Sequence, residues 1–204
     1  MNEKRYDLSF TTGALLRAES VKMATLYLDL NDWDSVRDAA LSTNLVQART
    51  VATSKRVCRE ICSRLKALNE RELQLLVNGT AQEQAYLLWL AICRRYEFLA
   101  DLATEVIHER YISLNYSLSY EDFDSFFNAK SEWHPEMDAV TSTTRSKLRQ
   151  VVFRMLREAG LLAKDNTMIA AMFSRQFLDA ISPANRANVK FFPVLDAEVK
   201  RNIG

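Results

Sequence analysis

The nine residues AYLLWLAIC, at positions 85–93, are the strongest apolar run of this 204-residue chain. They contain no charged residue, and Arg94 and Arg95 follow them directly. A membrane-spanning helix needs about 20 mostly apolar residues. The run is therefore too short to cross a bilayer, and it predicts a helix that is buried in the core of a protein.

The composition of the chain predicts an all-α fold around this run. Only four glycines and three prolines are present, so turn-forming residues are scarce and the connections between helices are expected to be short. A chain of this length can bury about 70% of the surface that it exposes when unfolded. It therefore needs no disulfide or metal to stabilise it.

The N-terminal sequence and the cysteine count indicate the compartment. The opening residues MNEKRYDLSF lack the long apolar segment of a secretory signal. Three cysteines in a chain without such a signal favour a reduced, cytoplasmic protein with no membrane association.

The segments on either side of the apolar run also have helical periodicity. Residues 69–79 carry Asn69 as an N-cap and end at Gly79, and residues 119–133 begin with Ser119 as an N-cap. Residues 80–114 are helical in pattern almost throughout, with a break expected near Arg95 and Tyr96. These segments form a central unit, residues 69–140.

Residues 1–68 are expected to form an N-terminal trihelical unit that resembles a helix-turn-helix. The first helix lies in SFTTGALLRAESVKMATLYLDL (9–30), with Thr11 or Thr12 as its N-cap. The second lies in residues 31–43, and the third in ARTVATSKRVCREICSRLKAL (48–68). Three short helices with a basic third helix are typical of this motif, although other small bundles give the same pattern.

Residues 141–182 are expected to form a C-terminal unit like a winged helix. The stretch STTRSKLRQVVFRMLREAGLL (142–162) predicts an amphipathic helix that is closed by Gly160. Two short apolar stretches then flank Asp165 and Asn166, a turn signal that predicts at most one short β-hairpin, the wing, within residues 161–171. Residues 183–204 are expected to be an extended or docked tail, and all of these units could also pack as one compact domain.

Charge is strongly segregated along the chain, although the formal net charge is only +1. Residues 49–66 hold six basic residues and one acidic residue, and residues 145–157 hold five basic residues and no acidic one. Residues 97–138 hold ten acidic residues against two basic ones. The neutral total therefore hides two basic helices and an acidic middle.

Each basic set lies opposite the apolar side of its helix when residues are placed 100° apart. Such a face can be merely solvated, but two of them, together with Ser and Thr at the helix starts, favour binding to the phosphates of double-stranded DNA. The predicted DNA contacts are Arg49, Lys55, Arg56, Arg59, Arg145, Lys147, Arg149, Arg154 and Arg157.

No pattern in the chain predicts catalysis, a metal site, a cofactor or a small-molecule substrate. Cys58 and Cys62 have the i, i+4 spacing of a ligand pair, but no second pair accompanies them, and core cysteines are the better interpretation. The segment EWHPEMD (132–138) could supply an acid–base pair, yet no nucleophile motif, phosphate loop or HExxH pattern is present. We instead expect His134 to lie in a turn and Trp133 to pack inward.

The aromatic residues near this segment are expected to be core residues as well. They recur at helical spacing, which favours packing over stacking on bases. The set comprises Tyr120, Phe123, Phe126 and Phe127.

Several motifs, in their order and spacing, resemble one family. They are LSFTTGALL, the DW at 32–33, RTVATSKRVCREICSRLKAL, LLWLAICRRY, FFNAKSEWHPEM and STTRSKLRQVVFRMLREAGLL. Together they are similar to the A component of the BREX (bacteriophage exclusion) phage-defence systems, over residues 7–182. The resemblance implies an all-helical, cytosolic accessory protein that binds DNA without catalysis, within a system that also contains a DNA methyltransferase and an ATPase.

Two functions therefore remain open at this point. The first is a DNA-binding accessory protein that grips a duplex through its basic helices. The second is a protein–protein adaptor whose acidic and aromatic middle docks another protein of the same defence system. RNA binding is a weaker third possibility, because no RNA-binding motif is visible.

Overall fold

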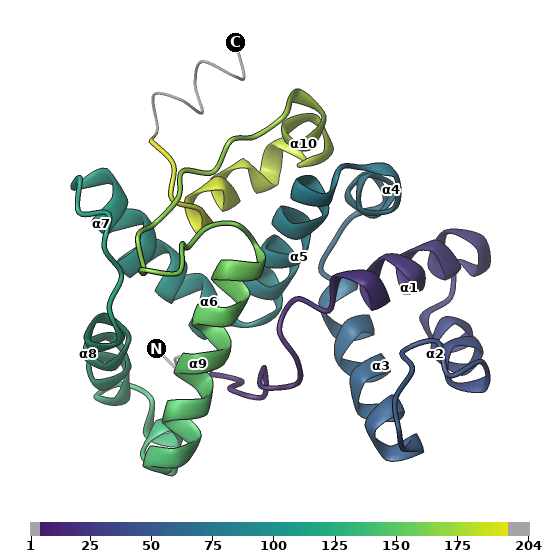
Figure 1. The fold of residues 1–204 in the computed structure, drawn as a ribbon, viewed down its shortest axis with the longest axis horizontal. Helices are drawn as coiled ribbons and strands as arrows, with labels where there is room; N and C mark the ends of the chain where they lie inside the picture. The colour runs from purple at the N-terminus through teal and green to yellow at the C-terminus, as the bar shows by residue number, and fades with distance from the viewer. Residues whose placement is uncertain (1–4, 196–204) are drawn as a thin grey trace.

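The computed structural model describes residues 5–195, and within them the all-α prediction is confirmed. Figure 1 shows the helices packed around a central one, with no β-strand in the described residues. The helices are α1 (Arg17–Leu30), α2 (Trp33–Ser42), α3 (Val51–Leu65), α4 (Glu70–Asn78), α5 (Ala81–Arg95), α6 (Glu97–Asp101), the π-helix η1 (Leu102–His108), α7 (Glu109–Ile112), α8 (Tyr120–Ser131), the 3-10 helix η2 (Pro135–Met137), α9 (Ser142–Glu158), α10 (Arg175–Ala180) and the 3-10 helix η3 (Pro183–Phe191).

Helix α5 is the centre of the fold, as the apolar run predicts. Every residue of the run 85–93 is buried, and α5 packs against α1, α3, α4, α6, α9 and η3. The indole N–H of Trp89 donates a hydrogen bond to the carbonyl oxygen of Phe191 at 2.8 Å, so its one polar atom is satisfied in the core. The helix ends at Arg95 and the chain breaks at Tyr96, where the sequence predicts a break.

The first helix begins later than the sequence predicts. Neither Thr11 nor Thr12 is its N-cap, because α1 starts at Arg17 after Leu16, which adopts a left-handed conformation with φ of 54°. The guanidinium of the buried Arg64 donates to the carbonyl oxygens of Ala14 at 2.5 Å and of Thr12 at 3.2 Å. These carbonyls are thereby held outside a helix, and the segment before α1 packs on the protein without regular secondary structure.

The predicted β-hairpin does not form as a pair of strands. The turn is present, with Asn166 at a φ of 67° and an isolated antiparallel bridge between Leu162 and Met168. The backbone hydrogen bonds on either side of this bridge form, but no strand continues from it, and the Met168 N–H on the outer edge donates to the carbonyl oxygen of Tyr116. Leu162 and Met168 are buried, so the segment folds onto the core and does not project as a wing.

The described part of the tail docks on the body of the protein. Residues Pro183–Phe191 form η3, which packs against η1 and α5. The side chains of Val189, Phe192 and Val194 are buried. Residues 196–204 of the predicted tail lie outside the described residues.

The buried side chains of all these elements form one continuous cluster that runs from Tyr6 to Val194. Polar pairs tie elements together inside it, the clearest being Glu72 of α4, whose carboxylate accepts from both terminal nitrogens of Arg94 on α5 at 2.7 and 2.9 Å. Within residues 5–195, no helix has the length and hydropathy to cross a membrane.

Candidate nucleic-acid interface

The N-terminal half of α3 presents an exposed basic face. The hydroxyl of Thr50 caps the helix by accepting from the Thr53 N–H at 3.2 Å. The helix then turns its apolar side, including Cys58, Ile61 and Leu65, into the core. The residues left on the outer side are Val51, Ala52, Lys55, Arg56 and Arg59, and all of them are exposed.

The basic groups of this face are not neutralised by the chain. Within the described residues, no ion pair or side-chain hydrogen bond holds Lys55, Arg56 or Arg59, and the same is true of Arg49 in the preceding loop. The acidic residue of the helix, Glu60, is buried.

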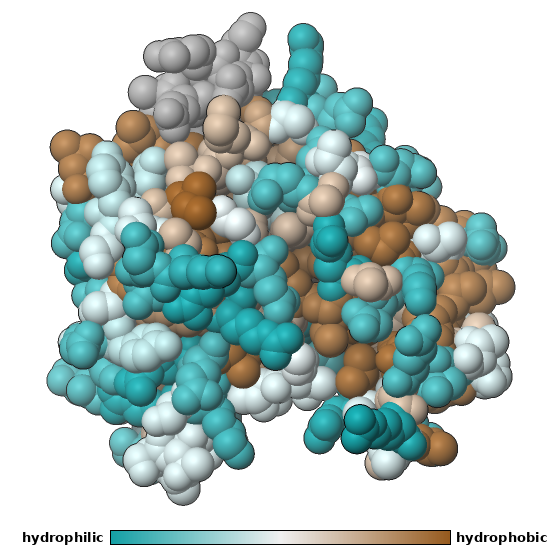
Figure 2. All heavy atoms as spheres, viewed as in Figure 1, coloured by the Kyte–Doolittle hydropathy of each residue, from teal (hydrophilic) through white to brown (hydrophobic). Residues whose placement is uncertain are grey.

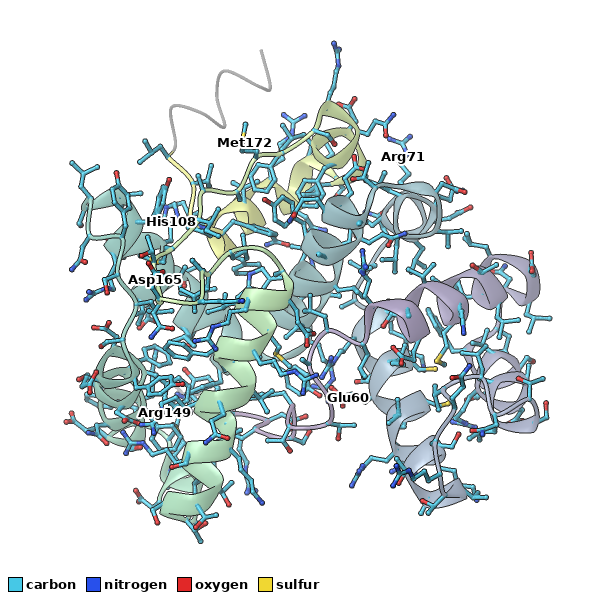
Figure 3. All side chains as sticks on the ribbon, in the orientation of Figure 1. Glu60, Arg71, His108, Arg149, Asp165 and Met172 are labelled. Carbon is cyan, nitrogen blue, oxygen red and sulfur yellow. The ribbon has the colours of Figure 1, made fainter. Side chains whose placement is uncertain are left out.

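Figure 3 shows Glu60 on the side of α3 that faces the rest of the molecule. There its carboxylate accepts from Arg64 at 2.6 Å and from the hydroxyl of Tyr96 at 2.6 Å. The carboxylate of Glu60 is therefore bound within the core, and the exposed charges on the outer side of α3 are all positive.

The second basic helix is different, because its arginines are used to hold it in place. Arg145 donates to Asp124 on α8 at 2.9 Å and to Asn128 at 2.7 Å, and its guanidinium lies 4.6 Å from the centre of the Phe127 ring. Arg149 pairs with the same Asp124. Figure 3 shows Arg149 on the side of α9 that faces α8.

Two of the remaining basic residues of α9, Lys147 and Arg154, are exposed, and Arg157 is half-buried. Arg154 pairs with Glu158 one turn later at 2.8 Å, and Arg157 donates to Asn166 at 2.6 Å. Lys147 is exposed and forms no ion pair within the described residues. Of the five basic residues predicted on α9, Lys147 and Arg154 are thus the ones best placed to meet an external phosphate.

The two basic helices begin at the same edge of the molecule. In Figure 1 both α3 and α9 start at the lower edge and run upward toward the middle. The space-filling view in Figure 2 shows a notch at this edge between the two helix starts, with hydrophilic side chains on both sides of it. The fold therefore brings the two predicted basic segments, which lie far apart in the sequence, to one rim.

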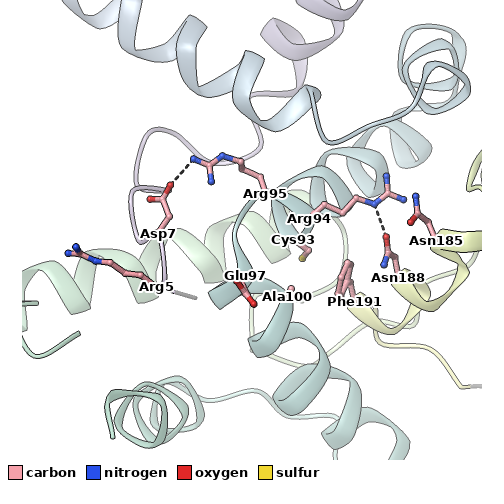
Figure 4. Close-up of a pocket in the computed structure, with 10 residues that line it drawn as sticks. All are labelled: Arg5, Asp7, Cys93, Arg94, Arg95, Glu97, Ala100, Asn185, Asn188 and Phe191. Carbon is pink, nitrogen blue, oxygen red and sulfur yellow. Dashed lines mark hydrogen bonds and ion pairs between the residues drawn. The ribbon is translucent and has the colours of Figure 1, made fainter. Parts of the chain in front are cut away.

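A separate hollow of about 390 Å³ lies at the C-terminal end of α5. Figure 4 shows that charged side chains line it, and two of its arginines already pair within the chain. Arg95 donates to Asp7 at 2.7 Å and Arg94 to Asn188 at 2.7 Å. We therefore assign it no ligand.

The cysteines that could have supplied metal ligands are packed in the core. Cys58, Cys62 and Cys93 are buried free thiols, and burial raises the pKa of Cys62 to about 11. Residues 5–195 contain no group of three or more His, Cys, Asp or Glu side chains placed to hold a metal. The predicted core position of these cysteines is confirmed.

The segment 132–138 is arranged differently from what the sequence predicts. His134 is buried, stacks on the ring of Tyr6 at 3.8 Å between centroids and pairs with Glu136 at 3.3 Å. Trp133 does not pack inward, since 70% of it is exposed. The turn places the histidine in the core, and the tryptophan beside it must therefore point outward.

The aromatic side chains of α8 are divided between core and surface. Phe123, Phe126 and Phe127 are buried around Phe98, whereas Tyr120 is partly exposed beside Arg149. The predicted core role is confirmed for the three phenylalanines. Sequence periodicity missed the exposure of Trp133, because this residue follows the end of the helix.

Comparison with known proteins gives one consistent family. The family model of BrxA matches residues 4–184. The BREX protein BrxA of Escherichia coli is 24% identical over 78% of this chain and 75% of its own length, and that of Bacillus cereus is 25% identical over 79% and 81%. An uncharacterized protein from Magnetospirillum magneticum has a similar fold, with a TM-score of 0.81, 22% identity, and coverage of 93% of this chain and 98% of its own.

Proposed function

The chain belongs to the BrxA family, and we propose that it is a non-enzymatic, DNA-binding component of a BREX phage-defence system. The observation that carries the proposal is the uncompensated basic face on the N-terminal half of α3. Three basic side chains of this face, Lys55, Arg56 and Arg59, have no acidic partner among the described residues, and neither has Arg49 in the loop before the helix. A surface of this kind attracts the phosphates of a duplex and releases their counterions.

The position of these residues on α3 also suits a DNA groove. In helix-turn-helix proteins, the N-terminal residues of the last helix reach into the major groove while neighbouring groups contact phosphates. Here the exposed face begins with two small apolar residues, Val51 and Ala52, and continues with Lys55 and Arg59. Bulky groups would hinder a close approach to the base edges, and small ones allow it.

Helix α9 contributes less to binding in this proposal. Arg145 and Arg149 share the carboxylate of Asp124, so one of their two positive charges is balanced locally and both side chains are held against α8. Lys147 and Arg154 remain as secondary phosphate contacts on the other side of the notch. We therefore assign the main share of the affinity to α3 and a smaller share to α9.

A mobility-shift experiment with the purified protein and a labelled linear duplex tests the proposal. The expected result is a shift at low salt whose affinity falls with a slope of about −0.9 in log–log units for each neutralised phosphate. Double-stranded RNA of the same sequence serves as the control for the RNA alternative, because its deep and narrow major groove does not admit a helix. Absence of any duplex shift at low salt would rule the proposal out.

A second candidate function is that of an adaptor for another protein of the same system. The phenylalanines of α8 cannot serve it, because they are buried. Trp133, which follows α8, is 70% exposed and is the observation that favours this function. Trp is among the residues most enriched at the energetic centres of protein interfaces.

A further inference from the structure

Trp133 is held at the surface by an ordered turn. Its backbone N–H donates to the carbonyl oxygen of Lys130 at 3.1 Å, and the His134 N–H donates to the same oxygen at 3.1 Å. The residues that follow are anchored, because His134 and Met137 are buried and η2 continues the turn. A large aromatic side chain is therefore presented to the outside by a rigid support, which lowers the entropy cost of binding a partner.

The surroundings of this tryptophan are acidic. Residues 131–141 contain Glu132, Glu136 and Asp138 and no lysine or arginine. Glu136 is occupied, since it accepts from the Tyr6 N–H at 2.6 Å and pairs with the neighbouring histidine. Glu132 and Asp138 are exposed, and neither forms an ion pair within the described residues.

The basic residues nearest in sequence do not compensate these carboxylates. Lys130 forms ion pairs with Asp101 at 3.2 Å and with Glu105 at 2.6 Å. Arg145 forms an ion pair with Asp124. Two exposed carboxylates without an ion pair among the described residues, Glu132 and Asp138, therefore lie in the same short segment as the exposed Trp133.

We propose that Trp133, with Glu132 and Asp138, is a docking point for an arginine- or lysine-bearing segment of a partner protein. A cation is attracted to the face of an indole ring more strongly than to any other aromatic ring. The two free carboxylates supply the complementary charge. DNA is disfavoured as the occupant, because its phosphates would be repelled by the same carboxylates.

The inference rests on the second candidate function and is independent of DNA binding through α3. The probe is an eight-residue peptide in which glycine and arginine alternate, measured by calorimetry on the full chain. The matched probe carries citrulline in place of arginine, which keeps nearly the same size and shape but replaces the charged guanidinium by a neutral ureido group. The arginine peptide is expected to bind, and the citrulline peptide is not.

Three variants test whether peptide binding depends on the aromatic ring of Trp133, on its apolar bulk or on any exposed aromatic residue. Trp133→Ala should weaken arginine-peptide binding roughly three- to thirty-fold, as expected for a lost cation–π contact. Trp133→Leu should weaken it to a similar degree, since it keeps apolar bulk and loses the π face. Tyr116→Ala removes another partly exposed aromatic residue, which has uncharged neighbours in the sequence, and should leave binding unchanged.

The same variants are also tested for duplex binding, so that failure of this inference can be told apart from failure of the DNA proposal. No binding of the arginine peptide at about 1 mM, equal binding of both peptides, or full affinity of Trp133→Leu would each overturn the docking proposal. Loss of duplex binding in Trp133→Ala with unchanged peptide binding would also overturn it, because the residue would then belong to the DNA interface. Trp133 is largely exposed, so both Trp133 variants are expected to melt like the parent, and the melting temperature of every variant is measured as the folding control.

Discussion

Replacing Glu72 by alanine should be one of the most damaging single changes to this fold. The carboxylate has no exposed surface and accepts three hydrogen bonds, two from Arg94 and one from the Asn69 N–H at 2.8 Å. It closes the N-terminus of α4 and ties that helix to α5. Alanine removes the acceptor and leaves the guanidinium of Arg94, which is itself largely buried, without its counter-charge.

The size of the effect follows from these contacts. Breaking one side of a buried ion pair costs about 3–5 kcal/mol. At about 2.1 cal/mol/K per residue, a chain of 204 residues has an unfolding entropy of about 430 cal/mol/K. The melting temperature should therefore fall by about 7–12 °C.

Thermal unfolding followed by circular dichroism measures this fall directly. Glu70→Ala is the matched control, because Glu70 is an exposed carboxylate in the same first turn of α4. Its removal should cost less than about 1 kcal/mol. If Glu72→Ala melts within the range of the Glu70→Ala control, the buried pair does not stabilise the protein in the way described.

Three further outcomes are expected. Asp124→Ala should destabilise the protein by about 1–3 kcal/mol, because the carboxylate is partly buried between two arginines. It should not lower duplex affinity, and a lower affinity in a mobility shift would contradict a purely structural role for Asp124. The pKa of Glu83 is held below its ordinary value by hydrogen bonds from the hydroxyl of Ser174 and the N–H of Thr80. The stability that this carboxylate contributes is therefore present above the ordinary glutamate pKa and is lost as the pH falls through the lowered pKa. Glu83→Gln should lose less melting temperature between pH 6 and pH 3 than the parent. Burial raises the pKa of the Cys62 thiol to about 11, so alkylation at pH 8 should be slow in the folded protein and fast in denaturant, and equal rates by mass spectrometry would show that the thiol is accessible.

The parts of the fold that local sequence determines were predictable. Helix α5 follows from one apolar run, and its end at Arg95 from the change in pattern there. The N-caps Asn69 and Ser119 act as predicted, because an N-cap needs only a side chain three residues from its partner. Gly160 closes α9 with a φ of 71°, a conformation that glycine adopts without strain.

The features that depend on long-range contacts were not predictable from local pattern. The start of α1 is set by Arg64, which lies 50 residues from the carbonyl it holds at Ala14. The hairpin segment does not project as a wing, because its outer edge hydrogen-bonds to Tyr116 in a distant loop and Leu162 and Met168 are buried in the core. In each case a local signal for a cap or a hairpin is overridden by a partner that only the folded chain brings near.

The candidate site shows the same division. The basic character of both helices is visible in the sequence, but its availability is not, because Asp124 lies 21 residues before Arg145. Periodicity places these arginines away from the apolar side or beside it, and cannot say which of them meets a carboxylate from another helix. The sequence therefore predicts a basic face on each of the two helices. The structure shows that the face of α3 has no ion pair among the described residues, whereas arginines of α9 pair with Asp124.

The most direct test of the DNA proposal compares two charge reversals in a salt titration of duplex affinity by fluorescence anisotropy. Arg56→Glu with Arg59→Glu changes the α3 face, and Arg186→Glu with Lys190→Glu, two exposed residues of η3, makes the same change in net charge elsewhere. Surface changes of this kind usually alter stability by no more than about 0.5 kcal/mol, so both variants should melt like the parent. The α3 variant should lose affinity for every duplex and flatten the log–log salt slope by about 1.8, the value for two phosphate contacts, while the η3 variant keeps nearly the parent's slope. Equal affinity and equal slope in the two folded variants would contradict DNA binding through α3.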